Sequence, residues 1–236
     1  MATRAGSRAI TLAHPHATRL ALRHLKQVDP IMGKLIGTVG ACGFRIRDDG
    51  AHFDHVVRAI VYQQLSGKSA ATIHARVHGL YGDRPPTPAE LAATPAGRLR
   101  RAGLSRQKLG YLKDLARRTA GGTLPLDALH TLPDEAVIEA LTAVRGVGTW
   151  TAQMFLMFRL GRLDVLPVLD LGIQKGMRSA YGLRRMPKAA QMERIAEAWR
   201  PYRSVACWYL WRAAEAAPPT RRRARPARRG KPRRAR

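Results

Sequence analysis

The sequence predicts an all-α protein built from many short helices. Apolar residues recur mostly at the three- and four-residue spacing of an amphipathic helix, and few segments alternate polar and apolar side chains as a half-buried strand would. At 236 residues, 45% of them hydrophobic, the chain is long enough to bury a substantial core. We therefore expect one large helical domain or two small ones.

The expected helices follow one another along the chain, separated mostly by proline and glycine. In order they cover residues 18–28, 30–36, 53–65, 68–80, 88–93, 95–102, 106–120, 133–143, 149–160, 171–180 and 188–215, the last broken at Pro201. Residues 1–16 are expected to be flexible, and the basic tail 217–236 is too poor in apolar residues to fold. The folded domain is therefore expected over residues 17–216.

Local signals justify the helices of the first half. Pro30 suits the first turn of the second helix, and the turn after it is predicted at Gly37, Gly40 and Gly43. The third helix is the clearest, because its apolar residues follow the i, i+3, i+4, i+7 rhythm: Phe53, Val56, Val57, Ile60, Val61 and Leu65. Ser66 interrupts this stripe and is expected to cap the next helix.

The second half carries comparable signals. Thr87 to Glu90 form a start signal for the helix 88–93, and Thr94-Pro95 precedes the next helix. Thr149 is expected to cap the helix 149–160. Asp170 directly precedes the helix 171–180 and suits its N-cap.

The charge points to a polyanionic partner. Forty-two basic residues face 16 acidic ones, for a net charge of +26; residues 221–236 hold ten Arg or Lys and no acid, which leaves 32 − 16 = +16 on the first 220 residues. We expect nucleic acid ahead of membrane, with compositional bias as the alternative explanation. No stretch reaches the roughly 18 apolar residues that a membrane span requires.

The cysteines and histidines show no evident metal site. Cys42 and Cys207 are far apart and form no CxxC motif, which fits a reducing compartment and excludes a cysteine-ligated zinc or iron–sulfur site. Three histidine pairs have spacings that could suit a metal: His14 with His16, His52 with His55, and His74 with His78. Because no set of carboxylates or cysteines completes any pair in the sequence, solvated histidines are expected.

A glycine turn between two helices is the first functional signal. In the stretch Leu141 to Gln153 (LTAVRGVGTWTAQ), one helix ends, Gly146 and Gly148 form a tight turn, and the next helix begins at Thr149. Such a turn lets backbone approach a partner closely and aims amide N–H groups at an anion. It is either an ordinary helical turn or a device that binds DNA phosphate without reading the bases.

Asp170 is the second signal. It lies among apolar residues in the stretch Asp164 to Ile173 (DVLPVLDLGI), just before a helix. The residue is either an N-cap or a carboxylate sheltered to face developing positive charge, and the two roles are compatible.

The ordered set of motifs resembles the helix-hairpin-helix DNA glycosylases, and the 3-methyladenine DNA glycosylase II branch in particular. The resemblance rests on the Gly-Val-Gly turn, on Asp170 beyond it, on Arg58 to Ser66 (RAIVYQQLS) and on Trp199 to Trp211 (WRPYRSVACWYLW). It implies a two-lobed helical fold. Too few residues precede the helices to form the N-terminal β domain of some relatives, and Arg145 stands where the family often has proline.

The resemblance implies that the chain flips alkylated purines out of double-stranded DNA and hydrolyses their N-glycosidic bond. Asp170 would stabilise the oxocarbenium-like transition state. Lyase members carry a lysine where this chain has Trp150, so a monofunctional enzyme that leaves an abasic site is expected. Trp150 and Trp211 would line the base pocket, where a cationic base stacked on indole gains about 1–2 kcal/mol; core packing is the alternative for both.

Other site residues follow from the same resemblance. Gln64 is the expected wedge that fills the gap left by the flipped nucleotide, with Leu65 beside it, although burial is the more natural role for Leu65. Gly146, Gly148 and Thr149 would bind DNA phosphate through their backbone. The carbonyls of Thr142, Val144 and Val147 would bind a Na⁺ or K⁺ ion, and no other cofactor is required.

The remaining expectations concern setting and alternatives. The basic residues of 105–118 form either a phosphate-facing edge or a solvated helix face, namely Arg106, Lys108, Lys113, Arg117 and Arg118. The protein is expected to act as a monomer in the cytoplasm, on the nucleoid in a bacterium, with a tail that adds salt-sensitive affinity for DNA. The alternatives are a non-enzymatic DNA-binding module and a glycosylase for another lesion.

Overall fold

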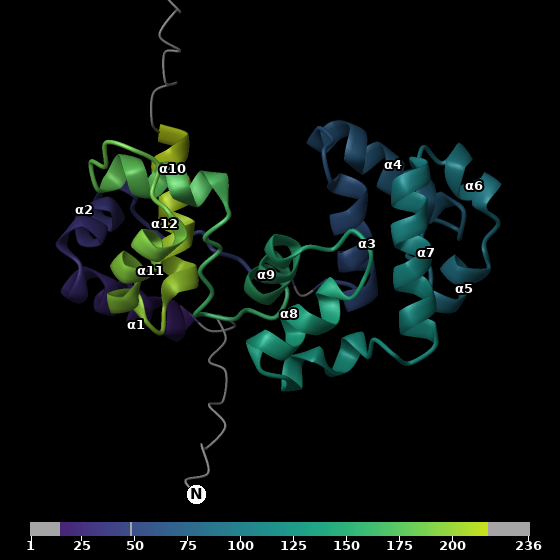
Figure 1. The fold of residues 1–236 in the computed structure, drawn as a ribbon, viewed down its shortest axis with the longest axis horizontal. Coiled ribbons are helices and arrows are strands. Elements are labelled where there is room, and N and C mark those ends of the chain that lie inside the picture. Colours follow the sequence, from purple (N-terminus) through teal and green to yellow (C-terminus); the bar gives the residue numbers. More distant parts are fainter. Residues whose placement is uncertain (1–14, 48, 217–236) are drawn as a thin grey trace, which may run out of the picture.

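A computed structural model describes residues 15–47 and 49–216 and shows helices joined by short loops, with no β-strand among these residues (Figure 1). The elements in chain order are α1 (Pro15–Val28), α2 (Pro30–Val39), α3 (His52–Tyr62), α4 (Gly67–Gly79), α5 (Pro88–Ala93), α6 (Ala96–Arg101), α7 (Arg106–Ala120), η1 (Leu126–Thr131), α8 (Asp134–Thr142), α9 (Thr149–Phe158), α10 (Leu171–Ala180), α11 (Ala189–Ala196), η2 (Glu197–Trp199) and α12 (Arg203–Ala216). The predicted all-α class is confirmed.

The observed helices lie close to the predicted ones, and α5, α7 and α10 match them. Three differences stand out. α1 begins earlier than expected, at Pro15; α2 continues to Val39, so Gly37 lies inside a helix; and the 3₁₀ helix η1 is absent from the prediction. Gly40, with φ +83°, ends α2. Of the segments expected to be flexible, 1–14 and 217–236 lie outside the described residues.

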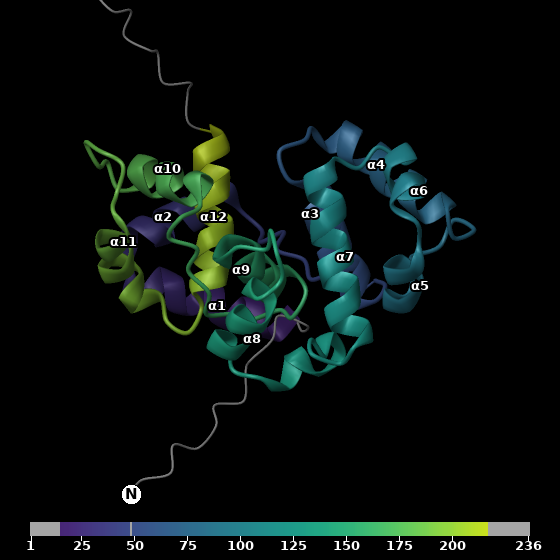
Figure 2. The ribbon, with the colours of Figure 1, turned by 45° about the vertical axis from the view of Figure 1, so that its right-hand side comes forward.

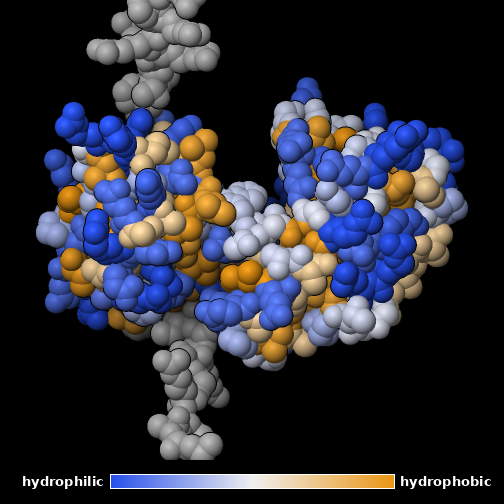
Figure 3. Space-filling model, in the orientation of Figure 1, coloured by the Kyte–Doolittle hydropathy of each residue, from blue (hydrophilic) through white to orange (hydrophobic). Residues whose placement is uncertain are grey.

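The helices form two lobes. The first lobe consists of α1, α2, α10, α11 and α12, and the second consists of the helices from α3 to α9 (Figures 1 and 2). The first lobe therefore contains both the first and the last helices of the chain. Apolar side chains of both lobes belong to one continuous buried cluster, which includes Leu25, Ile60, Leu112 and Trp199. A hollow between the lobes is open on the face shown in Figure 3. None of the helices in the described part is long and apolar enough to cross a membrane.

The first lobe depends on a close crossing of α10 and α12. A Cβ on Gly176 would lie 1.9 Å from the carbonyl oxygen of Leu210, so only glycine lets the two helix backbones approach this closely. The crossing places the N-terminus of α10 beside the C-terminal half of α12. Asp170 and Trp211 are carried by these two segments.

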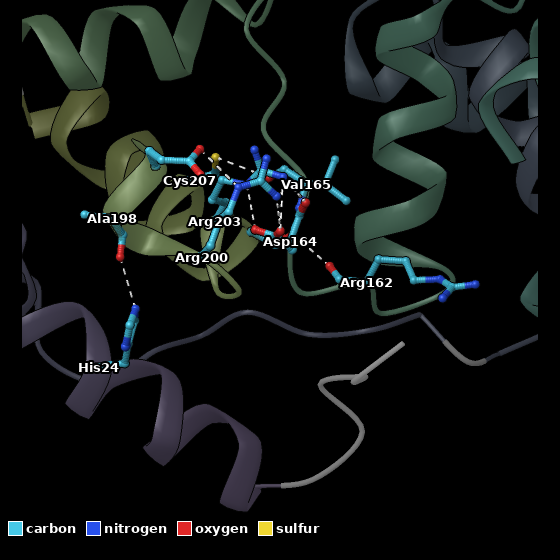
Figure 4. A network of polar contacts seen from close by, with 10 residues as sticks. His24, Arg162, Asp164, Val165, Ala198, Arg200, Arg203 and Cys207 are labelled. Atoms are coloured by element: carbon cyan, nitrogen blue, oxygen red, sulfur yellow. Dashed lines mark hydrogen bonds and ion pairs between the residues drawn. The ribbon is translucent and has the colours of Figure 1, made fainter. Parts of the chain in front are cut away.

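A polar network fastens the loop that leads to Asp170 (Figure 4). Asp164 accepts hydrogen bonds from Arg203 Nε at 2.6 Å and from Arg200 Nη1 at 2.7 Å. Ser204 Oγ accepts from the backbone N–H of Val165 at 3.0 Å and donates to the carbonyl of Arg162 at 2.7 Å. The start of the loop is therefore bound to the first turn of α12, the helix that also carries Trp211.

Candidate active site

The turn between α8 and α9 contains two glycines, and the first of them, Gly146, cannot be replaced by a larger residue. Gly146 has φ +80°, and a Cβ there would lie 2.1 Å from the ring of Tyr111, which packs beneath the turn. A Cβ on Gly148 would meet nothing within 4 Å. Gly146 is thus required by the protein itself, whereas the open side at Gly148 leaves room for a partner.

Neighbouring elements hold the turn in place. The Asp114 carboxylate on α7 accepts the backbone N–H of Arg145 at 2.9 Å, and Gln63 Nε2 donates to the carbonyl of Gly146 at 2.8 Å. Burial acts to raise the pKa of Asp114, but the hydrogen bonds from Arg145 and Arg118 outweigh it and lower the pKa. The segment after α3 and the hairpin turn therefore form one connected surface.

The prediction that Thr149 caps α9 is wrong by one residue. Gly148 is the N-cap, with extended backbone angles, and no side chain caps this helix end. Thr149 is the first helical residue instead. Because the first-turn N–H groups of a helix lack intrahelical partners, this N-terminus is available to an anion such as a phosphate.

Asp170 caps α10 and accepts two indole N–H groups. Its Oδ1 accepts from the Ile173 backbone at 2.8 Å and from Trp211 Nε1 at 2.9 Å, while its Oδ2 accepts from Trp150 Nε1 at 2.7 Å. The residue is only 8% exposed. Since Trp150 belongs to α9 and Trp211 to α12, the carboxylate lies where the two lobes meet.

Gly172 makes room for one of these indoles. A Cβ at this position would lie 2.7 Å from Trp211 Cδ1 and 3.0 Å from Asp170 Oδ1. The glycine two residues after Asp170 therefore allows Trp211 to reach the carboxylate. Nothing in the local sequence indicates this contact, because it joins residues far apart in the chain.

An aromatic cavity of about 470 Å³ lies beside Trp150. Trp150 is 45% exposed there, and Met154 and Phe158 follow it at four-residue intervals along α9. Phe158 stacks on Trp211 with ring centroids 5.7 Å apart and on Phe44 at 5.0 Å. Sequence reasoning missed Met154, Phe158 and Phe44, although the spacing of the first two from Trp150 could have indicated a shared helix face.

The predicted wedge lies in the turn between α3 and α4. α3 ends at Tyr62, and Gln64 adopts a left-handed conformation with φ +55°. Leu65 is 40% exposed, so the expectation that it continues the core stripe is wrong. The chain leaves helical geometry before Leu65, and the i+4 periodicity no longer directs its side chain into the core. The expected cap at Ser66 is present, accepting the Ser69 N–H at 3.3 Å.

Two lysines of α7 serve the fold. Lys108 Nζ donates to the carbonyls of Val61 and Gln63, both at 2.7 Å, at the C-terminal end of α3. Lys113 Nζ donates to the Leu91 carbonyl at 3.0 Å and to two further carbonyls at the end of α5. Burial lowers the pKa of both amines. Lys108 and Lys113 therefore belong neither to a phosphate-facing edge nor to a solvated helix face. They bind carbonyls at helix ends that have no partner within their own helix.

The histidines are also less solvated than expected. His52 Nδ1 accepts from Arg159 Nε at 2.7 Å, and burial together with the Arg159 charge lowers the pKa of His52. His74 and His78 both face the Asp54 carboxylate. The expectation that no carboxylate completes this pair is therefore wrong, because Asp54 comes from a different helix. His14 lies outside the described residues.

The predicted cation ligands belong to the same turn as Gly146. The Val144 carbonyl accepts the Val147 N–H at 3.1 Å, which leaves it a second lone pair. Thr142 ends α8, where the last carbonyls have no intrahelical partner. Backbone carbonyl oxygens can coordinate a monovalent cation such as K⁺.

The helical fold, the glycine hairpin and the carboxylate between two lobes define a class of DNA repair proteins, and comparison with known proteins agrees. Residues 57–201 match the family described as HhH-GPD superfamily base excision DNA repair protein. The chain belongs to this superfamily and to its 3-methyladenine glycosylase branch.

Named relatives support the branch. The chain is 32% identical to DNA-3-methyladenine glycosylase 1 of Schizosaccharomyces pombe, over 82% of this chain and 86% of that protein. It is 33% identical to DNA-3-methyladenine glycosylase 2 of Escherichia coli, over 77% and 65%.

Solved structures agree in fold. The structure of a DNA-3-methyladenine glycosidase from Bacillus halodurans superposes with a TM-score of 0.76 at 35% identity, covering 89% of this chain and 93% of that one. The S. pombe 3-methyladenine DNA glycosylase in complex with abasic DNA gives a TM-score of 0.73 at 32% identity, covering 84% and 98%.

Proposed function

We propose that this chain is a monofunctional DNA glycosylase that flips alkylated purines out of the duplex and hydrolyses their N-glycosidic bond. Bases of the 3-methyladenine and 7-methylguanine type are its substrates, and an abasic site is its product. The observation that carries the proposal is the Asp170 carboxylate, held by two indoles beside an aromatic cavity.

Asp170 supplies the charge that the reaction needs. Cleavage develops positive charge on the sugar, and a fixed carboxylate in a sheltered site stabilises it. The Oδ2 atom accepts one hydrogen bond, from Trp150, so a lone pair remains to orient the attacking water. An alkylated purine is already cationic and leaves as a neutral base, so a second acidic group is unnecessary.

Trp150 and Trp211 select the base. An electron-poor, cationic purine stacks favourably on electron-rich indole faces. The indole N–H groups of both residues point at Asp170, so the rings that would hold the base also orient the carboxylate. Trp150, Met154 and Phe158 line the cavity, and Trp211 is not among its lining residues but stacks on Phe158.

The lining of the cavity supports hydrolysis without strand cleavage. Its described lining residues include arginine and histidine but no lysine, and Trp150 follows the hairpin directly. An amine nucleophile that could attack the sugar and form a Schiff base is therefore absent from this lining.

DNA is the macromolecular partner. First-turn amides of α9, with the backbone of Gly146, Gly148 and Thr149, would bind a phosphate. The Thr142, Val144 and Val147 carbonyls would hold a Na⁺ or K⁺ ion, which supplies positive charge toward that phosphate.

Exposed Gln64 and Leu65 would fill the gap left by the flipped base, and Gln63 ties their turn to the hairpin. The protein would work as a monomer in the cytoplasm.

Release of methylated bases tests the proposal. DNA treated with a methylating agent is incubated with the wild type and with Asp170→Asn, and freed purines are separated by chromatography. We expect the wild type to release 3-methyladenine, and the variant to bind the same DNA but release the base about 10²–10³-fold more slowly. Strand breaks should require subsequent heat or alkali.

Other results would redirect the assignment. Strand breakage without heat or alkali would contradict the monofunctional mechanism. Release of a deaminated or oxidised base in place of 3-methyladenine would indicate another lesion. A folded wild type that binds DNA and releases no base from any of these substrates would indicate a non-enzymatic binding module.

A further inference from the structure

Asp54, His74 and His78 converge between the first turn of α3 and the C-terminal half of α4. His78 Nε2 lies 2.8 Å from Asp54 Oδ1, and His74 Nε2 lies 3.4 Å from the same oxygen. The ligand atoms of the three residues all lie within 4.8 Å of one another. The imidazole rings of His74 and His78 are 4.2 Å apart between centroids.

We propose that these three residues bind a divalent transition metal of the Zn²⁺ type, with a fourth coordination position left to water. Two imidazole nitrogens and a carboxylate oxygen are a ligand set that zinc accepts. Histidines at i and i+4 lie on one face of a helix, one turn apart, and can bind one ion together. Asp54 completes the set from the neighbouring helix.

The distances suit a tetrahedral ion. With metal–ligand bonds of about 2.0 Å, tetrahedral ligands lie about 3.3 Å from one another. The separation between His74 Nε2 and Asp54 Oδ1, 3.4 Å, already has this length. The 2.8 Å separation at His78 needs only a small opening. All three ligand atoms lie within 4.8 Å of one another, so rotation of these partly exposed side chains would close them around one ion.

His74 distinguishes a metal site from a plain helix clamp. Among the described residues its Nε2 is one of two buried side-chain atoms without a hydrogen-bond partner, although it points at a carboxylate. Leaving such a nitrogen unsatisfied costs free energy. An ion between the three ligands would give this nitrogen a partner and replace the single hydrogen bond from His78.

The surroundings permit a cation to enter. The three side chains are between 12% and 19% exposed and line a hollow of about 530 Å³. Arg58 also lines it, but its guanidinium is directed to Tyr62, with Nη1 donating to the hydroxyl at 2.7 Å and Cζ 3.9 Å from the ring centroid. Arg47 and His55 line the hollow as well, and so does a second carboxylate, Asp49, whose side chain is exposed. Asp54 is the carboxylate that directly faces both imidazoles.

The ion would fasten α3 to α4. These two helices flank the turn that carries Gln64 and Leu65, and the ligands lie at the opposite end of the helix pair. Binding would hold both helices at a fixed distance and so stabilise the pair. The consequence for a DNA wedge rests on the proposed function, but metal binding and stabilisation are independent of it.

Titration of the metal-free full chain with Zn²⁺ tests the site. Affinity is measured by competition with a chromophoric chelator, and a parallel titration with Co²⁺ reports coordination through its visible absorption. We expect one site per chain in the wild type, and a loss of affinity of at least about tenfold in His74→Gln/His78→Gln. Zn²⁺ should raise the thermal midpoint of the wild type and leave that of the double variant unchanged.

Two further variants keep the test decisive. His14→Gln/His16→Gln removes a different closely spaced histidine pair and should leave the affinity unchanged. Asp54→Asn keeps an oxygen that can accept the His78 hydrogen bond, so it should preserve the fold, measured by circular dichroism, while weakening Zn²⁺ binding. The proposal is overturned if the wild type shows no site, if binding survives Asp54→Asn at full affinity, or if the site disappears with His14 and His16. Zn²⁺ binding without a rise in thermal midpoint would overturn the fastening of α3 to α4.

Discussion

Asp29 and Asp170 each cap a helix of the first lobe, and each accepts an indole N–H. Asp29 caps α2, where its Oδ1 accepts from the Ile31 and Met32 backbones at 2.9 and 3.0 Å. Its Oδ2 accepts from Trp199 Nε1 at 2.8 Å and from the Tyr181 hydroxyl at 2.5 Å. The two aspartates are almost equally buried, at 9% and 8% exposed.

The surrounding side chains make the difference. The partners of Asp29 belong to the first lobe, and Trp199 is fully buried. Asp170 instead accepts from Trp150 of the second lobe, which is 45% exposed, and from Trp211. The same capping geometry therefore supports the interior of a lobe at Asp29, whereas at Asp170 it holds a tryptophan, Trp150, that lines an open cavity. The two carboxylates are almost equally buried, so what distinguishes the structural Asp29 from the candidate catalytic Asp170 is the exposure of the tryptophan that each one binds.

Replacing Asp170 should give the largest effect on function. Asp170→Asn should lower the rate of 3-methyladenine release by about 10²–10³-fold, the usual loss when one electrostatic stabiliser is removed. Asparagine is a good N-cap whose amide oxygen can still accept from Ile173 and Trp211, and its NH₂ group would face only the half-exposed Trp150 N–H, so the thermal midpoint should fall only slightly. Single-turnover release and thermal unfolding measure the two effects, and a variant that loses both together would contradict the separation of roles.

Replacing Asp29 should reverse this pattern. Asp29→Ala leaves the Tyr181 hydroxyl and the Trp199 N–H without their acceptor and removes the cap of α2. We expect the free energy of unfolding to fall by about 3 kcal/mol, while the folded fraction keeps its rate of base release. Denaturant titration and active-site-normalised rates measure these effects. A specific loss of catalysis would show that the two sites are coupled.

Trp150 tests whether the exposed partner matters. Trp150→Phe removes one hydrogen bond to Asp170 and weakens stacking, so release should fall about tenfold, equivalent to about 1–2 kcal/mol. Trp208→Phe on α12 is the matched control, because Trp208 contacts Tyr209 and Arg212 and does not line the cavity. Equal losses in both variants would argue against a special role for Trp150.

Acidic pH should reveal a smaller contribution of the ionised Asp29 carboxylate to the stability of the protein. Burial acts to raise its pKa, but hydrogen bonds from Tyr181, Met32, Trp199 and Ile31 outweigh burial and lower it below 3.8. Its contribution to stability is therefore complete above 3.8 and is lost as the pH falls through the lower, folded-state pKa. From about pH 5 downward, stability should fall more steeply in the wild type than in Asp29→Asn. Parallel slopes in thermal unfolding would contradict this assignment.

Much of the fold was predictable because helices follow local rules. The spacing of apolar residues and the caps at Ser66 and Asp170 gave helix positions that the structure confirms. The prediction failed where the backbone departs from regular helix geometry. At Gln64 a positive φ ends the helical apolar stripe, so Leu65 does not continue it into the core. The cap assigned to Thr149 differs by one residue, because a glycine can adopt the cap conformation itself.

The sequence by itself determined the helices, the glycine hairpin and Asp170 as the candidate carboxylate, since each is encoded within a few neighbouring residues. Only the tertiary structure decided which side chains meet. It brought Trp150 and Trp211 to opposite oxygens of Asp170, directed Lys108 to the end of α3, and joined Asp54 to His74 on another helix. Such contacts depend on how helices cross, and helix crossing is set by packing across the whole chain.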